Sequence, residues 1–243
     1  MINDDILEHA RRCAPAESCG WVVRTERGER YIPCENLSAE PTMYFRMPPE
    51  AYLNAQAVGD VVALVHSHPD GLPYLSDTDR KLQIQSGLAW WLVCDERICK
   101  FRCVPLLTGR GFEHGVMDCY TLFRDAYHLA GIDMPEFERD DDWWSKGKNL
   151  YLDNLEATGF YRVNPAEAQP GDVLICCFGS PTANHAAIYC GNGELLHHIP
   201  DQLSKRERYT DKWQRRTHSL WRHRLWQKYA FTGICNDLAA ASI

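Results

Sequence analysis

Two histidines and an aspartate, closely spaced in the sequence, could together bind a metal ion. His66 and His68 follow the apolar run 61–65, and Asp79 comes shortly afterwards. Residues i and i+2 of a strand point to the same side, so both imidazoles can face one ion. Two histidines and a carboxylate, with a fourth position open, are the ligands of a catalytic zinc site. We therefore predict metal ligands at these three positions.

The same residues allow a plainer interpretation. Ser76 and Asp79 have the spacing of a helix capping box with Asp in place of Glu, and a pair of histidines can be a surface feature. The whole pattern, H-x-H-x7-S-x2-D, is expected by chance only on the order of 10⁻³ times in a chain of this length. Because capping and metal binding are compatible, we keep the metal prediction.

A second group of residues could carry nucleophilic catalysis. Cys119 lies where a helix is expected to begin, and the positive N-terminus of a helix favours a thiolate. A thiol nucleophile also needs a base. His185 opens an apolar strand, and His197 and His198 end the next strand across a Gly-Asn-Gly turn, so either could orient His185. With eleven cysteines and ten histidines such pairs are easily found, so a buried thiol and surface histidines are the alternative.

These side chains must be positioned by two regions that mix helix and strand. In the first half, apolar runs and turn signals predict strands over 20–24, 30–33, 42–46, 61–65, 88–94 and 98–104, with helices over 48–58 and 76–86. In the second half they predict helices over 118–130 and 143–156, and strands over 173–178, 186–190 and 194–198. The acidic run 138–142 is interpreted as a solvated helix entry. Residues 105–116 are rich in Gly and Pro and lack a period, which indicates a linker.

The composition indicates a globular protein of two domains. The chain has 243 residues, 45% of them hydrophobic, and a formal net charge of −7. The negative charge argues against binding to nucleic acid or anionic membranes, and no apolar run approaches the ~20 residues that cross a bilayer. The eleven cysteines include no C-x-x-C pair, which favours reduced thiols. The polar start differs from a secretory signal, so we expect a protein that is made and used in a cytoplasm, or that leaves it by a route other than an N-terminal signal.

The first group resembles the JAMM motif of the MPN-type zinc peptidases and isopeptidases. That motif begins with a distant glutamate ahead of a small apolar strand, and Glu17 in ESCGWVV fits this place. The resemblance covers residues 1–107 and implies a compact α/β domain. It implies one Zn²⁺, held by His66, His68 and Asp79. Glu17 would take and return the proton of a water molecule, and Ser76 would hydrogen-bond the developing oxyanion.

The second group resembles the NlpC family of papain-like cysteine peptidases. The segments DC, PGD and HAAIYCGNGELLH occur in the order typical of that family. The resemblance implies a papain-like α+β domain over residues 117–243, after a linker at 108–116. It implies Cys119 as nucleophile, His185 as general base and His197 as orienting residue, with His198 as the competitor for that last role. Many members that cut cell wall have Ser-Gly after the cysteine, whereas this chain has Tyr-Thr, which would reshape the pocket.

The order of the two domains is itself informative. A JAMM-type domain followed directly by an NlpC-type domain is similar to the tail assembly protein K family of long-tailed bacteriophages, and DCYTLFRDAY and NLYLDNLEATGF resemble that family. The resemblance implies a bifunctional peptidase, made in the host cytoplasm, with phage tail-tip proteins as partners. It could process a tail component, or cleave peptidoglycan during genome entry and remain at the virion tail tip. The alternatives are a single-activity cell-wall hydrolase with a non-catalytic JAMM domain, and a structural tail-tip component with vestigial sites.

Overall fold

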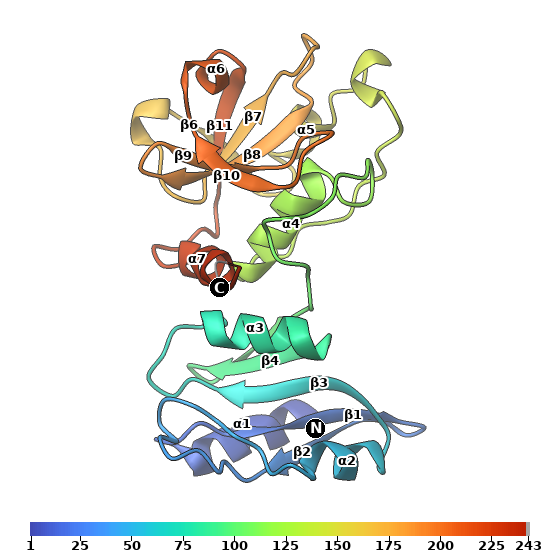
Figure 1. Ribbon diagram of the computed structural model, residues 1–243, viewed down its shortest axis with the longest axis vertical. Helices are drawn as coiled ribbons and strands as arrows, with labels where there is room; N and C mark the ends of the chain where they lie inside the picture. Colours follow the sequence, from blue (N-terminus) through green and yellow to red (C-terminus); the bar gives the residue numbers. More distant parts are fainter. Residues whose placement is uncertain (242–243) are drawn as a thin grey trace. The chain divides into compact units, whose positions relative to one another are not determined.

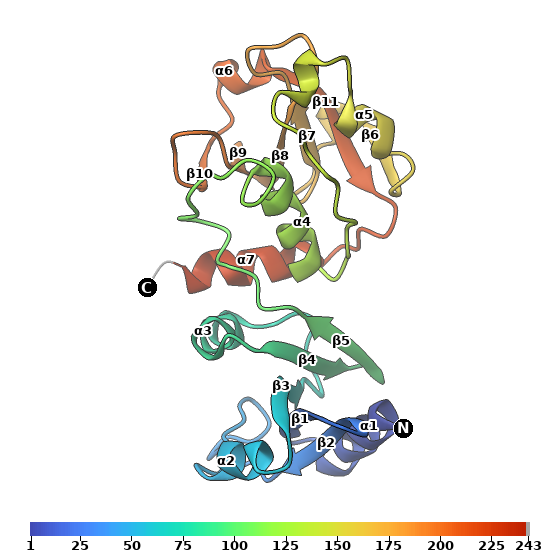
Figure 2. The same cartoon turned by 90° about the vertical axis from the view of Figure 1, so that its right-hand side faces the viewer.

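The chain folds into two compact units, and the computed structural model describes residues 1–241 (Figures 1 and 2). Unit 1 is Met1–Val104, and unit 2 begins at Pro105. All eleven cysteines are free thiols, in agreement with the prediction. Within residues 1–241 no helix combines the length and the apolar character that a membrane span requires.

Unit 1 is built on a five-stranded sheet in the order β2-β1-β3-β4-β5 (Figure 1). Strands β3 and β4 are parallel, and the other neighbours are antiparallel. The crossover between the parallel strands β3 and β4 contains α3. The carboxyl end of β3 and the start of α3 therefore lie at the same end of the sheet. The elements are α1 (Ile2–Cys13), β1 (Cys19–Thr25), β2 (Gly28–Cys34), α2 (Ala51–Gln56), β3 (Asp60–Ser67), α3 (Asp77–Ser86), β4 (Ala89–Cys94) and β5 (Arg97–Phe101).

Apolar side chains cover both faces of this sheet. On one face, Ile6 and Ala10 of α1 pack in a cluster with Val65 and other strand residues. On the other face, Ala55 of α2 lies in a cluster with Trp90. The central strands are therefore buried on both sides, which explains the continuous apolar run that predicted β3.

Two features of unit 1 differ from the sequence-based prediction. Helix α1 was not predicted, because its buried stripe consists only of Ile6 and Ala10 among polar residues. Residues 42–43 lie in a turn and residues 44–46 have no regular structure, in place of the predicted strand. The Asn36 side chain takes the place of a strand ladder there, since its oxygen accepts the N–H groups of Ser38 and Arg46. Its amide also donates to nearby carbonyl groups, so the loop satisfies its backbone locally.

Unit 2 contains a six-stranded antiparallel sheet in the order β10-β9-β8-β7-β11-β6. Helix α4 packs on β8 and on α7, and its aromatic side chains join Val173 and Ile175 of β7 in the main core. The elements are α4 (Cys119–Leu129), α5 (Leu150–Asn154), β6 (Phe160–Val163), β7 (Val173–Cys176), β8 (His185–Gly191), β9 (Glu194–His197), β10 (Lys205–Arg208), α6 (Asp211–Gln214), β11 (Thr217–His223) and α7 (Phe231–Ala240), with short 3₁₀ turns at Trp143–Ser145 and Pro165–Glu167.

Residues 105–116, which include the predicted linker, pack within unit 2. Gly109 N donates to the Ser204 carbonyl, and Ser204 N donates to the Arg110 carbonyl. The Arg110 guanidinium is buried and lies 2.8 Å from Asp125 of α4. The predicted helix over 143–156 is interrupted, because Gly147 adopts a positive φ between the 3₁₀ turn and α5.

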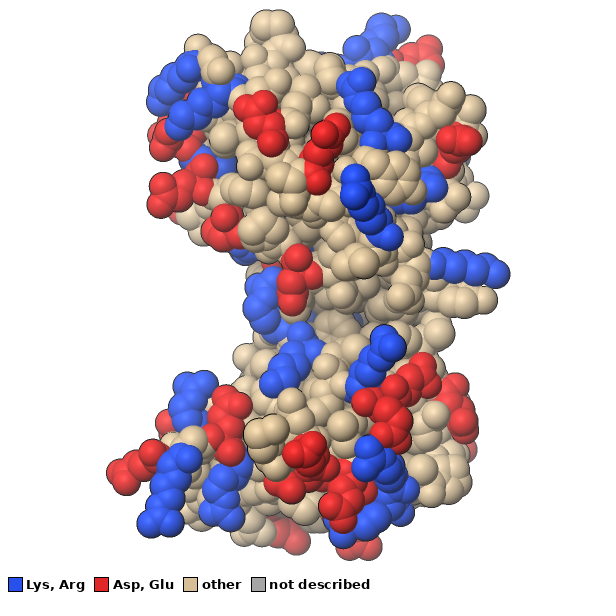
Figure 3. Space-filling view, turned by 180° about the vertical axis from the view of Figure 1, so that it is seen from behind, with Lys and Arg blue, Asp and Glu red and all other residues tan. Residues whose placement is uncertain are grey.

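Charged side chains are mixed on the surface. On the face drawn in Figure 3, acidic and basic residues alternate over each unit and do not gather into a patch of one sign. This pattern agrees with the negative net charge and offers no broad basic surface on that face.

Candidate functional site

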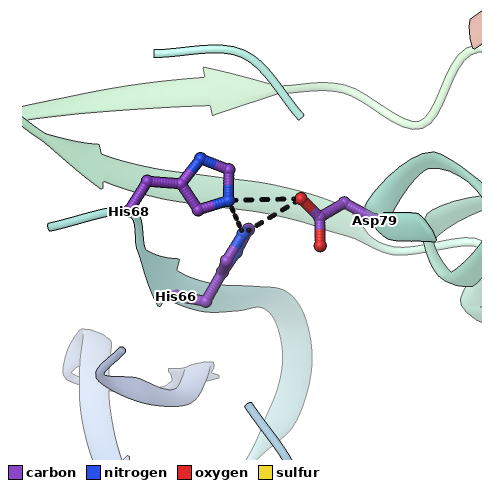
Figure 4. A group of neighbouring side chains, drawn as sticks. All are labelled: His66, His68 and Asp79. Carbon is purple, nitrogen blue, oxygen red and sulfur yellow. Dashed lines mark hydrogen bonds and ion pairs between the residues drawn. The ribbon is translucent and has the colours of Figure 1, made fainter. Parts of the chain in front are cut away.

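Three potential metal ligands converge in unit 1, at the edge where β3 ends and α3 begins (Figure 4). The Nε2 atoms of His66 and His68 lie 3.1 Å apart. Asp79 Oδ2 lies 3.4 Å from the first and 3.3 Å from the second. Ligand atoms of a tetrahedral zinc site are about 3.3 Å apart, given metal–ligand distances of about 2.0–2.1 Å. The three atoms therefore have the spacing that one zinc ion requires.

Short-range contacts hold each of these side chains in place. Asp79 Oδ2 accepts the Ser76 N–H at 2.8 Å, and the Ser76 hydroxyl accepts the Asp79 N–H at 3.0 Å, so the capping box exists together with the cluster. His68 Nδ1 lies 3.1 Å from the Leu72 carbonyl. A proton on Nδ1 donates to that carbonyl and leaves the Nε2 lone pair free for a metal.

His66 is fully buried between aromatic rings. Its ring centroid lies 5.0 Å from that of Phe45 and 5.3 Å from that of Trp90. Its Nδ1 has no hydrogen-bond partner among the described residues. Its Nε2 faces His68 and Asp79 and is the atom available for coordination. An imidazole placed in this way is costly unless Nε2 has a strong partner.

Glu17 lies beside this cluster, although it is remote in the sequence. β1 pairs with β3 in a register that matches Cys19 with His66, and continuing that register brings Glu17 opposite His68. The Ser18 N–H donates to the Ser67 hydroxyl at 2.8 Å, which fixes this end of the pair. Burial raises the pKa of Glu17 to about 7, against a smaller lowering by His68. A carboxyl group with such a pKa can both accept and release a proton near neutral pH.

In unit 2, Cys119 is the first residue of α4 and lies half-buried in a cleft of about 500 Å³. Asp118 caps the helix by accepting the Thr121 N–H at 3.0 Å. The Cys119 thiol and the Tyr151 hydroxyl are 3.2 Å apart, and either can donate. The cleft is lined by Phe112, His114, Asp118, Cys119, Arg139, Asp141, Asp142, Trp143, Trp144, Tyr151, Phe178, Asn184, His185, Ile199 and Pro200.

His185 lines the same cleft but makes no hydrogen bond to Cys119 in the described part of the chain. Its Nε2 is buried without a partner. Burial, followed by the charge of Asp118, raises the pKa of the Cys119 thiol to about 11. Burial, followed by His197 and His198, lowers the pKa of His185 to about 3. In this conformation the pair is therefore a neutral thiol and a neutral imidazole at pH 7.

The strand register separates the two candidate orienting histidines. β8 and β9 pair Ile188 with Leu196, and continuing that register places His197 opposite Ala187. His185 is on the same face as Ala187, so His185 and His197 share a face, with ring centroids 6.2 Å apart. His198 points to the opposite face and lies instead near Phe112.

His197 is linked to a carboxylate. Its Nε2 lies 3.5 Å from Glu207 Oε1, and Glu207 also accepts a bond from the Trp213 indole. Trp213 is buried and packs against both imidazoles of this face, with ring centroids 4.6 Å from His197 and 5.8 Å from His185.

Sequence reasoning did not find Tyr151 or Arg139. Both residues line the cleft of Cys119. Tyr151 lies in NLYLDNLEATGF, which was matched to the family without a role for that residue, and Arg139 lies within a run that is otherwise acidic. The apolar residues around Tyr151 predicted a helix, and its segment resembled the family, but neither signal indicated a role in the cleft.

Comparisons with known proteins match both units. The family model for prokaryotic homologs of the JAB domain matches residues 2–104, and the NlpC/P60 family model matches residues 109–222. These matches and the observed folds confirm the predicted order of an α/β JAMM-type domain and an α+β NlpC-type domain.

Whole-chain relatives come from two phages. The chain is 75% identical over 196 residues to the tail tip assembly protein K of Escherichia phage lambda, covering 81% of this chain and 98% of that protein. It is 36% identical over 230 residues to the tail tip assembly protein K of Escherichia phage N15, covering 91% and 93%. A shorter alignment, 35% identical over 104 residues, joins it to the desampylase of Haloferax volcanii and covers 37% of this chain and 73% of that protein.

Proposed function

Because this chain belongs to the tail tip assembly protein K family, we propose that it is a two-site peptidase of phage tail assembly. Its two domains belong to peptidase families. Unit 1 would act as a zinc metallopeptidase and unit 2 as a cysteine peptidase. The observation that carries the proposal is the triangle of His66, His68 and Asp79, whose ligand atoms have the separations that zinc requires.

In unit 1, His66, His68 and Asp79 would hold the ion. When bound, zinc polarises a carbonyl group and acidifies a water molecule. Glu17, opposite His68, would accept a proton from the attacking water and deliver it to the leaving amine. The Ser76 hydroxyl keeps a hydrogen to donate while its oxygen caps α3, so it could stabilise the oxyanion.

In unit 2, Cys119 would be the nucleophile. Its proton would pass to His185 as sulfur attacks the scissile carbonyl carbon, and the C–N bond would break as His185 returns that proton to the leaving amine. Water would then hydrolyse the thioester and release the carboxylic acid and the thiol. His197 shares a face with His185 and would orient it, with Glu207 supporting His197.

The family places this protein in phage tail assembly. Partners would be tail-tip proteins during assembly in the host cytoplasm, and bacterial peptidoglycan if the protein remains at the virion tail tip. Tyr120 is buried in the main core and its hydroxyl donates to the Pro135 carbonyl, so the residue after the nucleophile packs away from the described lining of the cleft. The substrate of unit 2 would instead meet the loop residues that line the cleft, which include Asp141, Trp143 and Trp144.

Metal analysis tests the central observation. Protein purified without added metal should contain about one zinc per chain, and the His66→Ala/His68→Ala variant should contain none. His218→Ala, which removes an exposed histidine, should keep the metal. If the wild-type protein takes up no added zinc, unit 1 is a structural scaffold and not a metallopeptidase.

Hydrolysis assays separate the two sites. Purified peptidoglycan and purified tail-tip proteins would be offered to the wild type, to Glu17→Ala and to Cys119→Ala. We expect each variant to lose one cleavage and keep the other. Peptidoglycan cleavage by Glu17→Ala but not by Cys119→Ala, with no cleavage of tail-tip proteins by the wild type, would favour the single-activity cell-wall hydrolase with a non-catalytic JAMM domain.

A further inference from the structure

A buried arginine lies behind Cys119. Arg139 belongs to the acidic run 138–142, which we interpreted as solvated, yet its side chain is only 5% exposed. The fork shape of a guanidinium lets it bind several groups at once. Its bonds run to Asp118 Oδ2 (2.8 Å), Gly115 O (2.9 Å), Thr121 Oγ1 (3.2 Å), Glu136 Oε1 (3.0 Å) and the Phe137 carbonyl.

The principal partner of Arg139 is the helix cap beside the nucleophile. Asp118 is 2% exposed. One carboxylate oxygen accepts the Thr121 N–H, and the other accepts Gly115 N–H at 2.9 Å together with Arg139 Nε. Burial would raise the pKa of the Asp118 carboxyl, but the bonds from Thr121 and Arg139 outweigh it and the net shift is downward. Asp118 is therefore an anion next to the residue that must become a thiolate.

Several groups act on the Cys119 thiol from the elements around it. Besides burial, the Asp118 charge opposes ionisation, whereas the Tyr151 hydroxyl, the Ala186 N–H and the Arg139 charge favour it. Cys176 of β7 is also close enough to interact with Cys119. The remaining titratable groups of the cleft are His114, Asp141, Asp142 and His185.

We infer that Arg139 is a positioning residue for Cys119: it neutralises the Asp118 cap and ties the 113–117 turn to α4, so that the thiol can ionise at the helix start. This inference rests on the proposed role of Cys119 as nucleophile. Without Arg139, Asp118 would still cap the helix but its charge would face the thiolate uncompensated in a site of low polarity.

If Arg139 were only a structural anchor, a different result would be expected for the variant that lacks both Arg139 and Asp118. If Arg139 acts through the charge of Asp118, removing both charges restores the balance of the wild type. If it only holds the turn, removing both residues is at least as harmful as removing Arg139 alone. Asn is a good helix cap, so Asp118→Asn removes the charge while the cap remains. The two variants thus form a double-mutant cycle.

The experiment measures alkylation of Cys119 by iodoacetamide between pH 7 and pH 10 in the full chain, following the Cys119 peptide by mass spectrometry. At pH 8 we expect Arg139→Gln to slow alkylation about three- to tenfold and Asp118→Asn to accelerate it by a similar factor. The double variant should lie within about twofold of the wild type. Arg224→Gln, which removes an exposed charge away from the cleft, should have no effect.

Two results would overturn the inference: an unchanged pH profile in Arg139→Gln, or a folded double variant as slow as Arg139→Gln. If Arg139→Gln does not fold, Asp118→Asn still tests the electrostatic part, and an unchanged rate there contradicts it. Alkylation does not require a substrate, so failure of the proposed peptidase activity would appear separately, as a reactive thiol that cleaves nothing.

Discussion

The two sites differ in how their reactive atoms are assembled. In unit 1 the three ligand atoms already lie 3.1–3.4 Å from one another. His68 and Asp79 are held by contacts within four residues of their own positions, and His66 packs against aromatic rings. In unit 2 the thiol contacts Tyr151, while His185 stands in the same cleft without a bond to it. A metal site built from a strand end and a helix start is thus preorganised, whereas the thiol site depends on elements that are far apart in the sequence.

Their electrostatics differ as well. In unit 1 burial opposes the charge on Asp79, but His66, His68 and the Ser76 N–H outweigh it and lower the pKa of that carboxyl. In unit 2 burial dominates, and both Cys119 and His185 are neutral. The ionised carboxylate of unit 1 therefore suits a cation, while unit 2 holds its thiol and imidazole in their neutral forms.

The largest expected effect tests the preorganised site. Asp79→Asn removes the anionic ligand but keeps an oxygen that can accept the Ser76 N–H, so α3 stays capped. We expect zinc affinity, measured by competition with a chelating dye, to fall at least about 100-fold. Ser76→Ala should show the reverse pattern, losing about 1 kcal/mol of stability with a much smaller loss of affinity. Wild-type affinity in Asp79→Asn would refute the ligand assignment.

The second test concerns the two neighbouring histidines of unit 2. His197→Gln should reduce the hydrolysis rate about 100-fold, because His185 loses its orienting neighbour. His198→Gln, a change of the same size at an equally buried position on the other face, should stay within about threefold of wild type. Initial rates on purified peptidoglycan, with circular dichroism as a check of folding, measure the difference. Equal losses in both variants would contradict the register argument.

Acid should destabilise unit 2 through its buried histidines. Burial lowers the folded-state pKa of His185 to about 3 and that of His197 to about 4. Their stabilising contribution is therefore complete above pH ~6.5 and is lost as pH falls toward 4, by about 1.4 kcal/mol per pH unit for each histidine.

Urea unfolding with pulse proteolysis can follow the fragments of each unit in the intact chain. The midpoint for unit 2 should fall between pH 6.5 and pH 4.5. The fall should be shallower in His185→Gln/His197→Gln, because that variant lacks the two buried imidazoles whose pKa values are lowered most. A midpoint independent of pH in the wild type would show that these histidines can be protonated without cost.

The smallest expected effect concerns Tyr151. Tyr151→Phe keeps the ring that packs against Trp143 but removes the hydroxyl 3.2 Å from the thiol. Because that hydroxyl can donate to a thiolate, alkylation of Cys119 at pH 8 should slow about threefold. Faster alkylation would mean that the hydroxyl shields the thiol from the reagent. Cys119 would then be less accessible than its place in an open cleft indicates.

The sequence alone determined the parts of each site that depend on neighbours along the chain. His66 and His68 face one side because a strand repeats every two residues, and Ser76 and Asp79 meet because a capping box closes over three. The placement of Cys119 at a helix start follows from the same short-range rules. The role of Glu17 came only from resemblance to a family.

Tertiary structure decided everything that depends on strand pairing or on distant segments. The β1–β3 register brings Glu17 to His68, and the β8–β9 register turns His197 toward His185 and His198 away. Arg139 reaches Asp118 from a loop that local patterns describe as solvated. Local rules extend over only a few residues, whereas register and loop docking are set by which faces of the whole chain become buried together.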